Sequence, residues 1–160
     1  MVKSQYYNSR KGRRCRGNAA SEFAIALPFL LMLMLGSAEL GRMMFSYITL
    51  DKAVRGSARY VADHALDGST GLILISADVA SSARNLVVYG APAIGDGEPL
   101  LDGLSGNDVT VQAIDNIHLQ VTASYQFTPI FSHIPTFGFT QQDISLEVTL
   151  NSAVTMRALR

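Results

Sequence analysis

Residues 16–35 have the sequence RGNAASEFAIALPFLLMLML, and this stretch indicates how the N-terminal part of the chain folds. Residues 1–17 hold six basic side chains and no acidic one. Residues 23–38 carry no charge, and Glu22 is the single carboxylate between the two segments. A carboxylate at the start of an apolar helix is costly in lipid, so its presence there indicates a function. The stretch therefore predicts an apolar, membrane-spanning helix that begins with one functional acid.

The overall composition hides a strong asymmetry of charge. The 160 residues contain thirteen basic and thirteen acidic side chains, but without residues 1–17 seven basic side chains remain against thirteen acidic ones, a net charge of −6. Such a chain lacks the clustered lysine and arginine that nucleic-acid phosphates require, so we expect no nucleic-acid partner. The basic cluster directly before the apolar run indicates instead an N-terminus that stays in the cytoplasm.

The apolar run belongs to one long helix, predicted from Asn18 to about Leu66. The run is rich in Leu and Met and shows no strand-like alternation. With its flanks it gives a membrane span over about residues 20–40, near the lower end of the length that a bilayer requires. Pro28 lies inside this span, where a proline more often kinks a helix than ends it. Asn18 or Ser21 is expected to cap the start of the helix.

Beyond the span the helix is predicted to become amphipathic. An apolar stripe recurs at spacings of three and four residues, at Tyr47, Leu50, Val54, Ala58, Val61 and Ala65. A ladder of charges follows another side, at Asp51, Arg55, Arg59 and Asp63. Glu39 and Arg42 form a candidate membrane-boundary pair, which we expect to be solvated and worth little energetically. The apolar side of the helix must be covered, either by the C-terminal part of the chain or by neighbouring chains.

The C-terminal part is predicted to combine a helix with a small sheet. Ser76–Tyr89 has a helical pattern, and residues 90–108, rich in Gly, Pro and Asp, form a long loop. Alternation of apolar and polar side chains then predicts three strands, at 109–113, 119–127 and 144–150, with a turn at Asp115-Asn116. Each strand has one apolar face, and the dry side of the long helix is the available cover. The predicted fold class is α+β, a long N-terminal helix packed by a small antiparallel sheet.

Three motifs resemble a known family. They are the stretch Arg16–Leu30 with its Gly17-to-Glu22 spacing and internal proline, the motif Glu39-Leu-Gly-Arg42, and the motif Ala58-Arg-Tyr-Val-Ala62. Together they resemble TadE-like pseudopilins of the tight-adherence, or Flp-type, pilus system. The resemblance covers residues 16–63, and residues 125–129 and 153–157 resemble the family more weakly. It implies a type IV pilin-like fold.

The resemblance also implies how the chain is processed and assembled. A prepilin peptidase would cut between Gly17 and Asn18, so that Glu22 becomes the fifth residue of the mature chain. Glu22, with Phe23 beside it, would then serve assembly, because in related pilins this glutamate is thought to pair with the terminal amine of a neighbouring subunit. From the residues alone, a carboxylate that merely caps the helix at the lipid headgroups fits Glu22 equally well.

These inferences predict the organisation of the chain. Residues 1–17 are a cleaved leader, residues 18–67 the long helix, and residues 68–160 a periplasmic or extracellular α+β head. We expect a single-pass protein of the bacterial inner membrane, N-terminus in the cytoplasm, which later joins the pilus at the cell surface. The implied function is that of a minor pilin that enters or primes the fibre for adhesion or secretion. Its partners would be the prepilin peptidase, other pilin and pseudopilin subunits, and the inner-membrane assembly platform.

Two other classes of protein fit the N-terminal sequence. A Sec-exported protein would use residues 23–35 as the apolar core of a signal peptide and be cut after residues 36–38. A charge and a proline within or beside that core argue against it. A single-span membrane protein with a periplasmic binding domain would never polymerise. The three classes differ in the mature N-terminus, which would be Asn18, Glu39 or Met1.

No residue pattern supports catalysis or metal binding. His64, His118 and His133 lack metal-ligand spacing, and no nucleophile elbow is present. Cys15, the sole cysteine, lies in the predicted leader. We therefore expect no enzyme activity, no catalytic residue, no metal and no cofactor.

Overall fold

The computed structural model of this chain describes residues 18–66, 73–93, 97–130, 133–134, 144–145 and 147–158. The chain divides into two compact units, one ending at Ala38 and the other beginning at Glu39. The predicted leader, residues 1–17, lies outside the described residues, and so does the predicted boundary between helix and head at residues 67 and 68.

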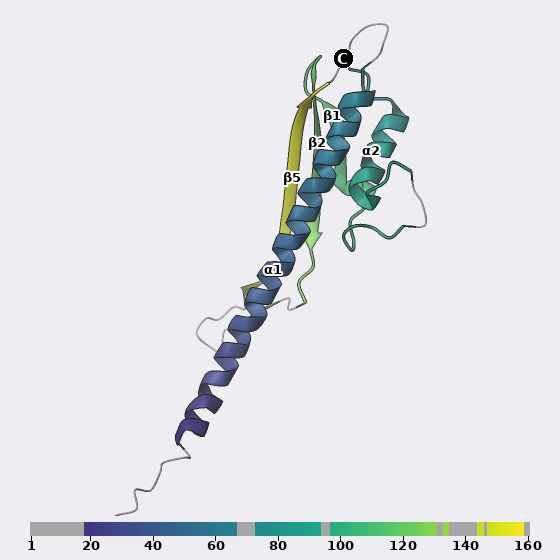
Figure 1. The fold of residues 1–160 in the computed structure, drawn as a ribbon. Coiled ribbons are helices and arrows are strands. Elements are labelled where there is room, and N and C mark those ends of the chain that lie inside the picture. The colour runs from purple at the N-terminus through teal and green to yellow at the C-terminus, as the bar shows by residue number, and fades with distance from the viewer. Residues whose placement is uncertain are drawn as a thin grey trace, which may run out of the picture. The chain divides into compact units, whose positions relative to one another are not determined.

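The first helix, α1 (Asn18–His64), confirms the long N-terminal helix that the sequence predicts (Figure 1). Pro28 lies inside it, and so does Ser21, which is therefore not its N-cap. An 18-residue window within the helix has a mean hydropathy of 2.0. By length and composition, α1 is thus able to cross a membrane.

From Glu39 onward α1 is amphipathic, as predicted. Residues of the predicted stripe with no exposed surface are Leu50, Val54, Ala58, Val61 and Ala65. The predicted charge ladder lies toward solvent, and within it Nε of Arg55 donates to Oδ2 of Asp51 at 2.8 Å. The apolar side of this part of α1 therefore belongs to the core of the second unit.

The prediction for Tyr47 is wrong, because this residue is 44% exposed. The buried side continues instead through Ser46 and Met43, which are half-buried, to Glu39, which is buried. With Leu50, these positions are spaced by three or four residues and share one side of the helix. Because a serine and a glutamate lie on that side, the hydropathy pattern does not reveal that this part of the helix is buried.

The second helix, α2 (Ala77–Tyr89), is confirmed within one residue of its predicted start. Ser76 caps it with an Oγ that accepts a backbone N–H of the first turn at 3.3 Å. Gly90 ends it with φ at 74°, a left-handed conformation that glycine adopts without strain. Oγ of Ser57 on α1 donates to the carbonyl O of Ala83 at 2.8 Å, and both residues are buried. The two helices are therefore in contact.

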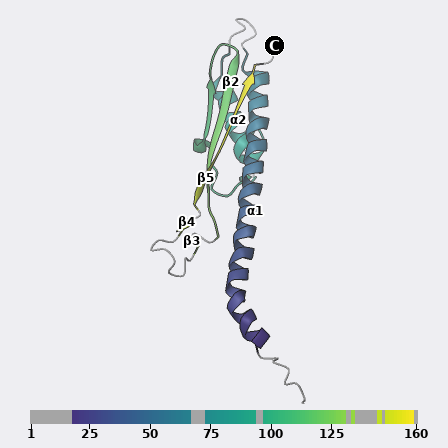
Figure 2. The same ribbon diagram turned by 90° about the vertical axis from the view of Figure 1, so that its left-hand side faces the viewer.

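Three strands form one antiparallel sheet in the order β1-β2-β5 (Figures 1 and 2). They are β1 (Val109–Ala113), β2 (His118–Phe127) and β5 (Val148–Arg157), and a 3-10 turn, η1 (Gly106–Asp108), leads into the first. Every odd-numbered residue of β2 from Leu119 to Phe127 is buried. This face of the sheet packs on α1 and α2 in a single core. The predicted α+β class is thereby confirmed.

The opposite face of the sheet is polar. The amide of Gln112 donates to Oε1 of Gln120 at 3.1 Å, and Oγ1 of Thr149 donates to Oε1 of Gln126 at 2.7 Å. Cross-strand pairs of this kind stabilise a sheet from its solvent side.

The prediction of a third strand over residues 144–150 is wrong in its limits. Residues 144–145 form β4, which pairs with β3 (His133–Ile134), whereas β5 ends seven residues later than predicted. All ten residues of β2 pair with β5, so the length of β2 sets that of its partner. The extension turns Ser152 inward, where its Oγ donates to Oδ1 of Asp51 at 3.1 Å. An inward serine breaks the alternation from which a strand is predicted.

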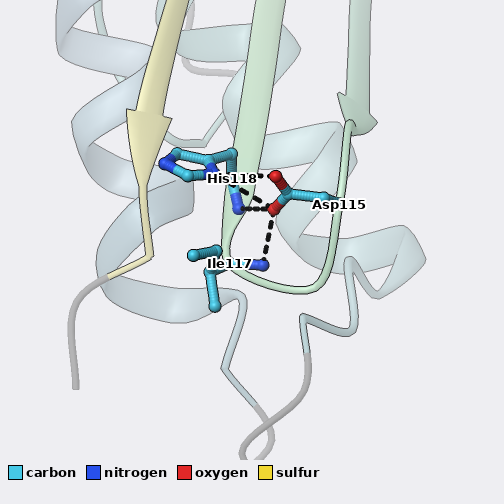
Figure 3. Close-up of polar contacts among 3 residues, drawn as sticks. All are labelled: Asp115, Ile117 and His118. Atoms are coloured by element: carbon cyan, nitrogen blue, oxygen red, sulfur yellow. Dashed lines mark hydrogen bonds and ion pairs between the residues drawn. The ribbon is translucent and has the colours of Figure 1, made fainter.

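Asp115 closes the turn between β1 and β2, at the predicted position (Figure 3). Its Oδ1 accepts the backbone N–H groups of Ile117 at 2.8 Å and of His118 at 2.6 Å. Nδ1 of His118 lies 2.8 Å from its Oδ2. The N–H of Ile117 and then the ring of His118 favour the ionised carboxylate, and they hold the pKa of Asp115 below its ordinary value of 3.8.

Asp115 should make the stability of the sheet depend on pH in the acid range. Because folding lowers the pKa of this carboxyl, its contribution is complete above pH 3.8 and is lost as the pH falls through the lower pKa of the folded state. We expect Asp115→Asn to melt below the wild type at neutral pH, and the difference to vanish in strong acid. Thermal unfolding across the pH range measures this, and a difference independent of pH would contradict it.

Candidate assembly site

The predicted assembly residues lie in the first two turns of α1. Asn18 and Glu22 are four residues apart, hence one turn apart on the same side of the helix. Glu22 is exposed, and Phe23 beside it is 59% exposed. Gly17, on the other side of the predicted cleavage, lies outside the described residues. Pairing of Glu22 with an amine on Asn18 of a neighbouring chain stays a prediction.

Residues 23–38 of this helix present an apolar surface. No side chain from Ala19 to Ala38 is buried. Large apolar side chains exposed in this range are Phe23, Ile25, Leu27, Phe29, Leu30, Leu31, Leu33, Met34 and Leu35. Oγ of Ser37 donates to the carbonyl O of Met34 at 2.8 Å, so its hydroxyl is satisfied within the helix. A surface of this kind suits lipid or other apolar helices and is unfavourable in water.

Glu39, at the start of the second unit, is buried with only 5% of its surface exposed. Its Oε1 accepts from Nη1 of Arg42 at 2.9 Å and from the backbone N–H of Ile130 at 2.9 Å. Ile130 lies 91 residues further along the chain, just after the end of β2. Glu39 therefore fastens the segment that leaves β2 to α1, and it satisfies a backbone N–H beyond the reach of the sheet.

Arg42 connects the same acid to the last residue of β2. Its guanidinium carbon lies 5.5 Å from the centre of the Phe127 ring, within the range of a cation–π contact. Tyr125, two residues before Phe127, is buried. Its hydroxyl donates to the carbonyl O of Asp102 at 3.0 Å. Burial raises the pKa of Tyr125, the charge of Asp102 adds to the increase, and the charge of Arg42 opposes it. The positive charge of Arg42 thus interacts with two aromatic residues at the end of β2, Phe127 and Tyr125.

The Glu39–Arg42 ion pair is present, but it is not the solvated pair that the sequence led us to expect. The side chain of Arg42 is 47% exposed, whereas that of Glu39 is 6% exposed. A buried carboxylate that also holds a backbone N–H contributes more than a surface pair does. The signal for this burial is the spacing from Glu39 through Met43 and Ser46 to Leu50. The location of the pair at a membrane boundary stays a prediction.

Replacement of Glu39 should loosen the end of β2. Glu39→Ala leaves the N–H of Ile130 without an acceptor and Arg42 without its counterion, and we expect a loss of about 2 kcal/mol in unfolding free energy. Glu39→Gln keeps an acceptor for the N–H and should cost about half as much. Thermal unfolding of the full chain in detergent micelles measures both. Asp63→Ala, at an exposed acid of the same helix, is the control, and a Glu39→Ala protein as stable as this control would contradict the assignment.

Comparison with known proteins bears on this same segment. The family model described as TadE-like protein matches residues 17–59. The match begins at Gly17, includes Glu22, Glu39 and Arg42, and lies within residues 16–63, where the sequence motifs resemble this family. No curated protein and no solved structure matches the chain. Residues 17–59 are therefore similar to the TadE-like family, which is associated with the tight-adherence pilus.

Proposed function

We propose that this chain is a minor pilin of a tight-adherence pilus, stored in the bacterial inner membrane and then incorporated into the fibre or used to prime it. One observation carries the proposal: the TadE-like match begins at Gly17, and the helix that follows it begins at Asn18 with Glu22 as its fifth residue. A single N-terminal apolar helix fits a single-pass membrane protein of such a system. The proposed role is structural and involves no catalysis.

The charge of the N-terminal segment supports an orientation. Six basic side chains precede the span, and positive residues of this kind remain on the cytoplasmic side of a membrane. The head then lies in the periplasm until the subunit leaves the membrane. The exposed apolar surface of residues 19–38 is covered by lipid during storage and by other apolar helices in a fibre.

Cleavage between Gly17 and Asn18 is the step that converts the stored form into an assembly-competent one. A glycine before the scissile bond admits the backbone to a protease cleft in an extended form, which a bulky side chain hinders. The cut removes six positive charges and creates one new amine on Asn18.

Glu22 then pairs with the Asn18 amine of a neighbouring subunit. An isolated charge among apolar helices is unfavourable, so both groups are tolerated only together. Such a pair sets the register between subunits more than it adds stability. Asn18 and Glu22 lie one turn apart on the same side of α1, so each subunit presents both halves of the contact on one side of its helix.

The runner-up is a protein with the same span that does not polymerise. Exposed apolar side chains on α1 suit lipid as well as they suit neighbouring helices. A Sec-exported form would begin at Glu39, the first residue of the second unit. The non-polymerising protein is not cut after Gly17, and the Sec-exported protein is cut elsewhere. Cleavage after Gly17 therefore distinguishes the proposed function from both alternatives.

Gly17→Leu should block processing. We expect the full-length chain to accumulate in the inner membrane, because a branched side chain next to the scissile bond hinders binding in the protease cleft. Intact mass of the membrane-extracted protein measures the mature fraction. Gly12→Leu, the same change elsewhere in the leader, is the control and should mature normally. Normal maturation of the Gly17 variant would refute the prepilin assignment.

Glu22→Gln should abolish assembly without blocking membrane insertion or cleavage. If Glu22 pairs with a neighbour's amine, the glutamine strands a buried cation, a loss of about 3–5 kcal/mol for a fully buried pair. If Glu22 only caps the helix, the change is nearly silent. Co-purification with other pilus subunits measures assembly, and Glu22→Asp, which keeps the charge, should retain most of it. A correctly cleaved Glu22→Gln protein that assembles normally would reduce Glu22 to a cap.

A further inference from the structure

A pocket of about 460 Å³ lies in the second unit, where α1 meets β5. It is lined by Arg55, Gly56, Arg59 and Ala62 of α1 and by Met156 and Arg157 of β5. Three arginines, two small residues and a methionine thus line the pocket. None of these residues has a part in the proposed function.

The pocket carries an excess of positive charge. Oδ2 of Asp51 accepts a hydrogen bond from Nε of Arg55 at 2.8 Å, so the guanidinium of Arg55 already has an acidic partner. This contact holds the pKa of Asp51 below its ordinary value. Among the described residues neither Arg59 nor Arg157 forms an ion pair, although Asp63 is one turn from Arg59. The leader-free chain has only seven basic residues, and three of them line this pocket.

The hollow at Gly56 is not required by the packing of the chain itself. A Cβ built on Gly56 would meet nothing within 4 Å. Glycine inside a helix is less favourable than alanine, because it loses more backbone freedom on folding. A glycine at an uncrowded position of a cationic pocket is what a group from another molecule would need in order to approach the helix closely.

The opposite edge of the sheet is acidic. The sheet order puts β5 at one edge and β1 at the other, and α2 contacts both β1 and η1 (Figure 1). The acidic edge consists of Asp78 on α2, Asp108 in η1, and Glu98 and Asp102 in the loop between them. Arg84 is the one basic residue described in these elements.

We propose that the pocket receives a carboxylate from the acidic edge of a second copy of this chain. A guanidinium group binds a carboxylate through two parallel hydrogen bonds, and two arginines without acidic partners are available for it. Because the pocket and the acidic edge are different surfaces, the contact joins unlike faces, head to tail, and leaves one free pocket and one free acidic edge on each pair of copies. The inference rests on the proposed function, since it assumes that copies of this chain associate.

Lipid phosphates are not the occupant of this pocket. If the span ends near residue 40, Arg55 lies about 22 Å further along α1, at 1.5 Å per residue. The headgroup layer of a bilayer extends only about 5–8 Å beyond the hydrocarbon core. The pocket is therefore out of reach of the membrane that stores the subunit.

Site-specific photocrosslinking in membranes tests the contact. A photoreactive residue replaces Lys52, which is exposed on α1 one turn before Gly56 and does not line the pocket. We expect adducts between two copies of the full chain that map by mass spectrometry to the acidic edge. Their yield should fall at least tenfold in Arg59→Glu/Arg157→Glu and return when Glu98→Lys/Asp102→Lys is added to the same chain.

Two further variants separate docking from folding and from surface charge. Gly56→Leu fills the hollow without changing charge, so it should remove the adduct while the melting temperature stays the same or rises. Ser124→Glu/Gln126→Glu adds acid to the outer face of the central strand β2 and should leave the adduct unchanged. Unchanged yield in the pocket variants, or adducts that map to another protein or another surface, would overturn the inference.

A second photoreactive position at Phe23 distinguishes this inference from the proposed function. If the probe at Phe23 gives adducts between subunits and the probe at Lys52 gives none that depend on the pocket, only the inference is refuted, and the proposed function stands. Absence of subunit adducts at both positions in the wild type refutes the proposed function and the inference together.

Discussion

The fold depends on one buried stripe of α1. Leu50, Val54 and Val61 have no exposed surface, and the inner face of the sheet and one side of α2 pack on them in a single core. Neither the sheet nor a thirteen-residue helix such as α2 can bury its apolar face alone. The α+β class, the layer order and the polarity of the outer sheet face all follow from the need to cover this stripe.

The same helix serves a second purpose before it reaches that core. Its side chains from Phe23 to Leu35 are apolar and mostly exposed, and those from Glu39 onward are divided into a buried and a solvated side. Glu39 is the first buried residue along the helix, and its bond to the N–H of Ile130 ties α1 to the segment leaving β2. In a stored pilin the head would begin directly at the residue where the helix emerges from lipid.

The elements governed by local pattern were predictable from the sequence, and those governed by distant partners were not. Periodicity gave the long helix, α2 and the first two strands, and the family motifs gave the candidate assembly site around Glu22. The limits of β5 follow from pairing with β2, and its inward Ser152 is satisfied by Asp51, 101 residues earlier. Burial of Glu39 likewise depends on a residue 91 positions away. The pocket between α1 and β5 arises only from their packing.

The proposed role as a pilin requires that the chain be cut before the helix that carries Glu22. Its most direct test is the N-terminal sequence, with intact mass, of the protein purified from the membranes of cells that produce it. The account predicts a chain that begins at Asn18. A chain that begins at Met1 or at Glu39 would contradict it.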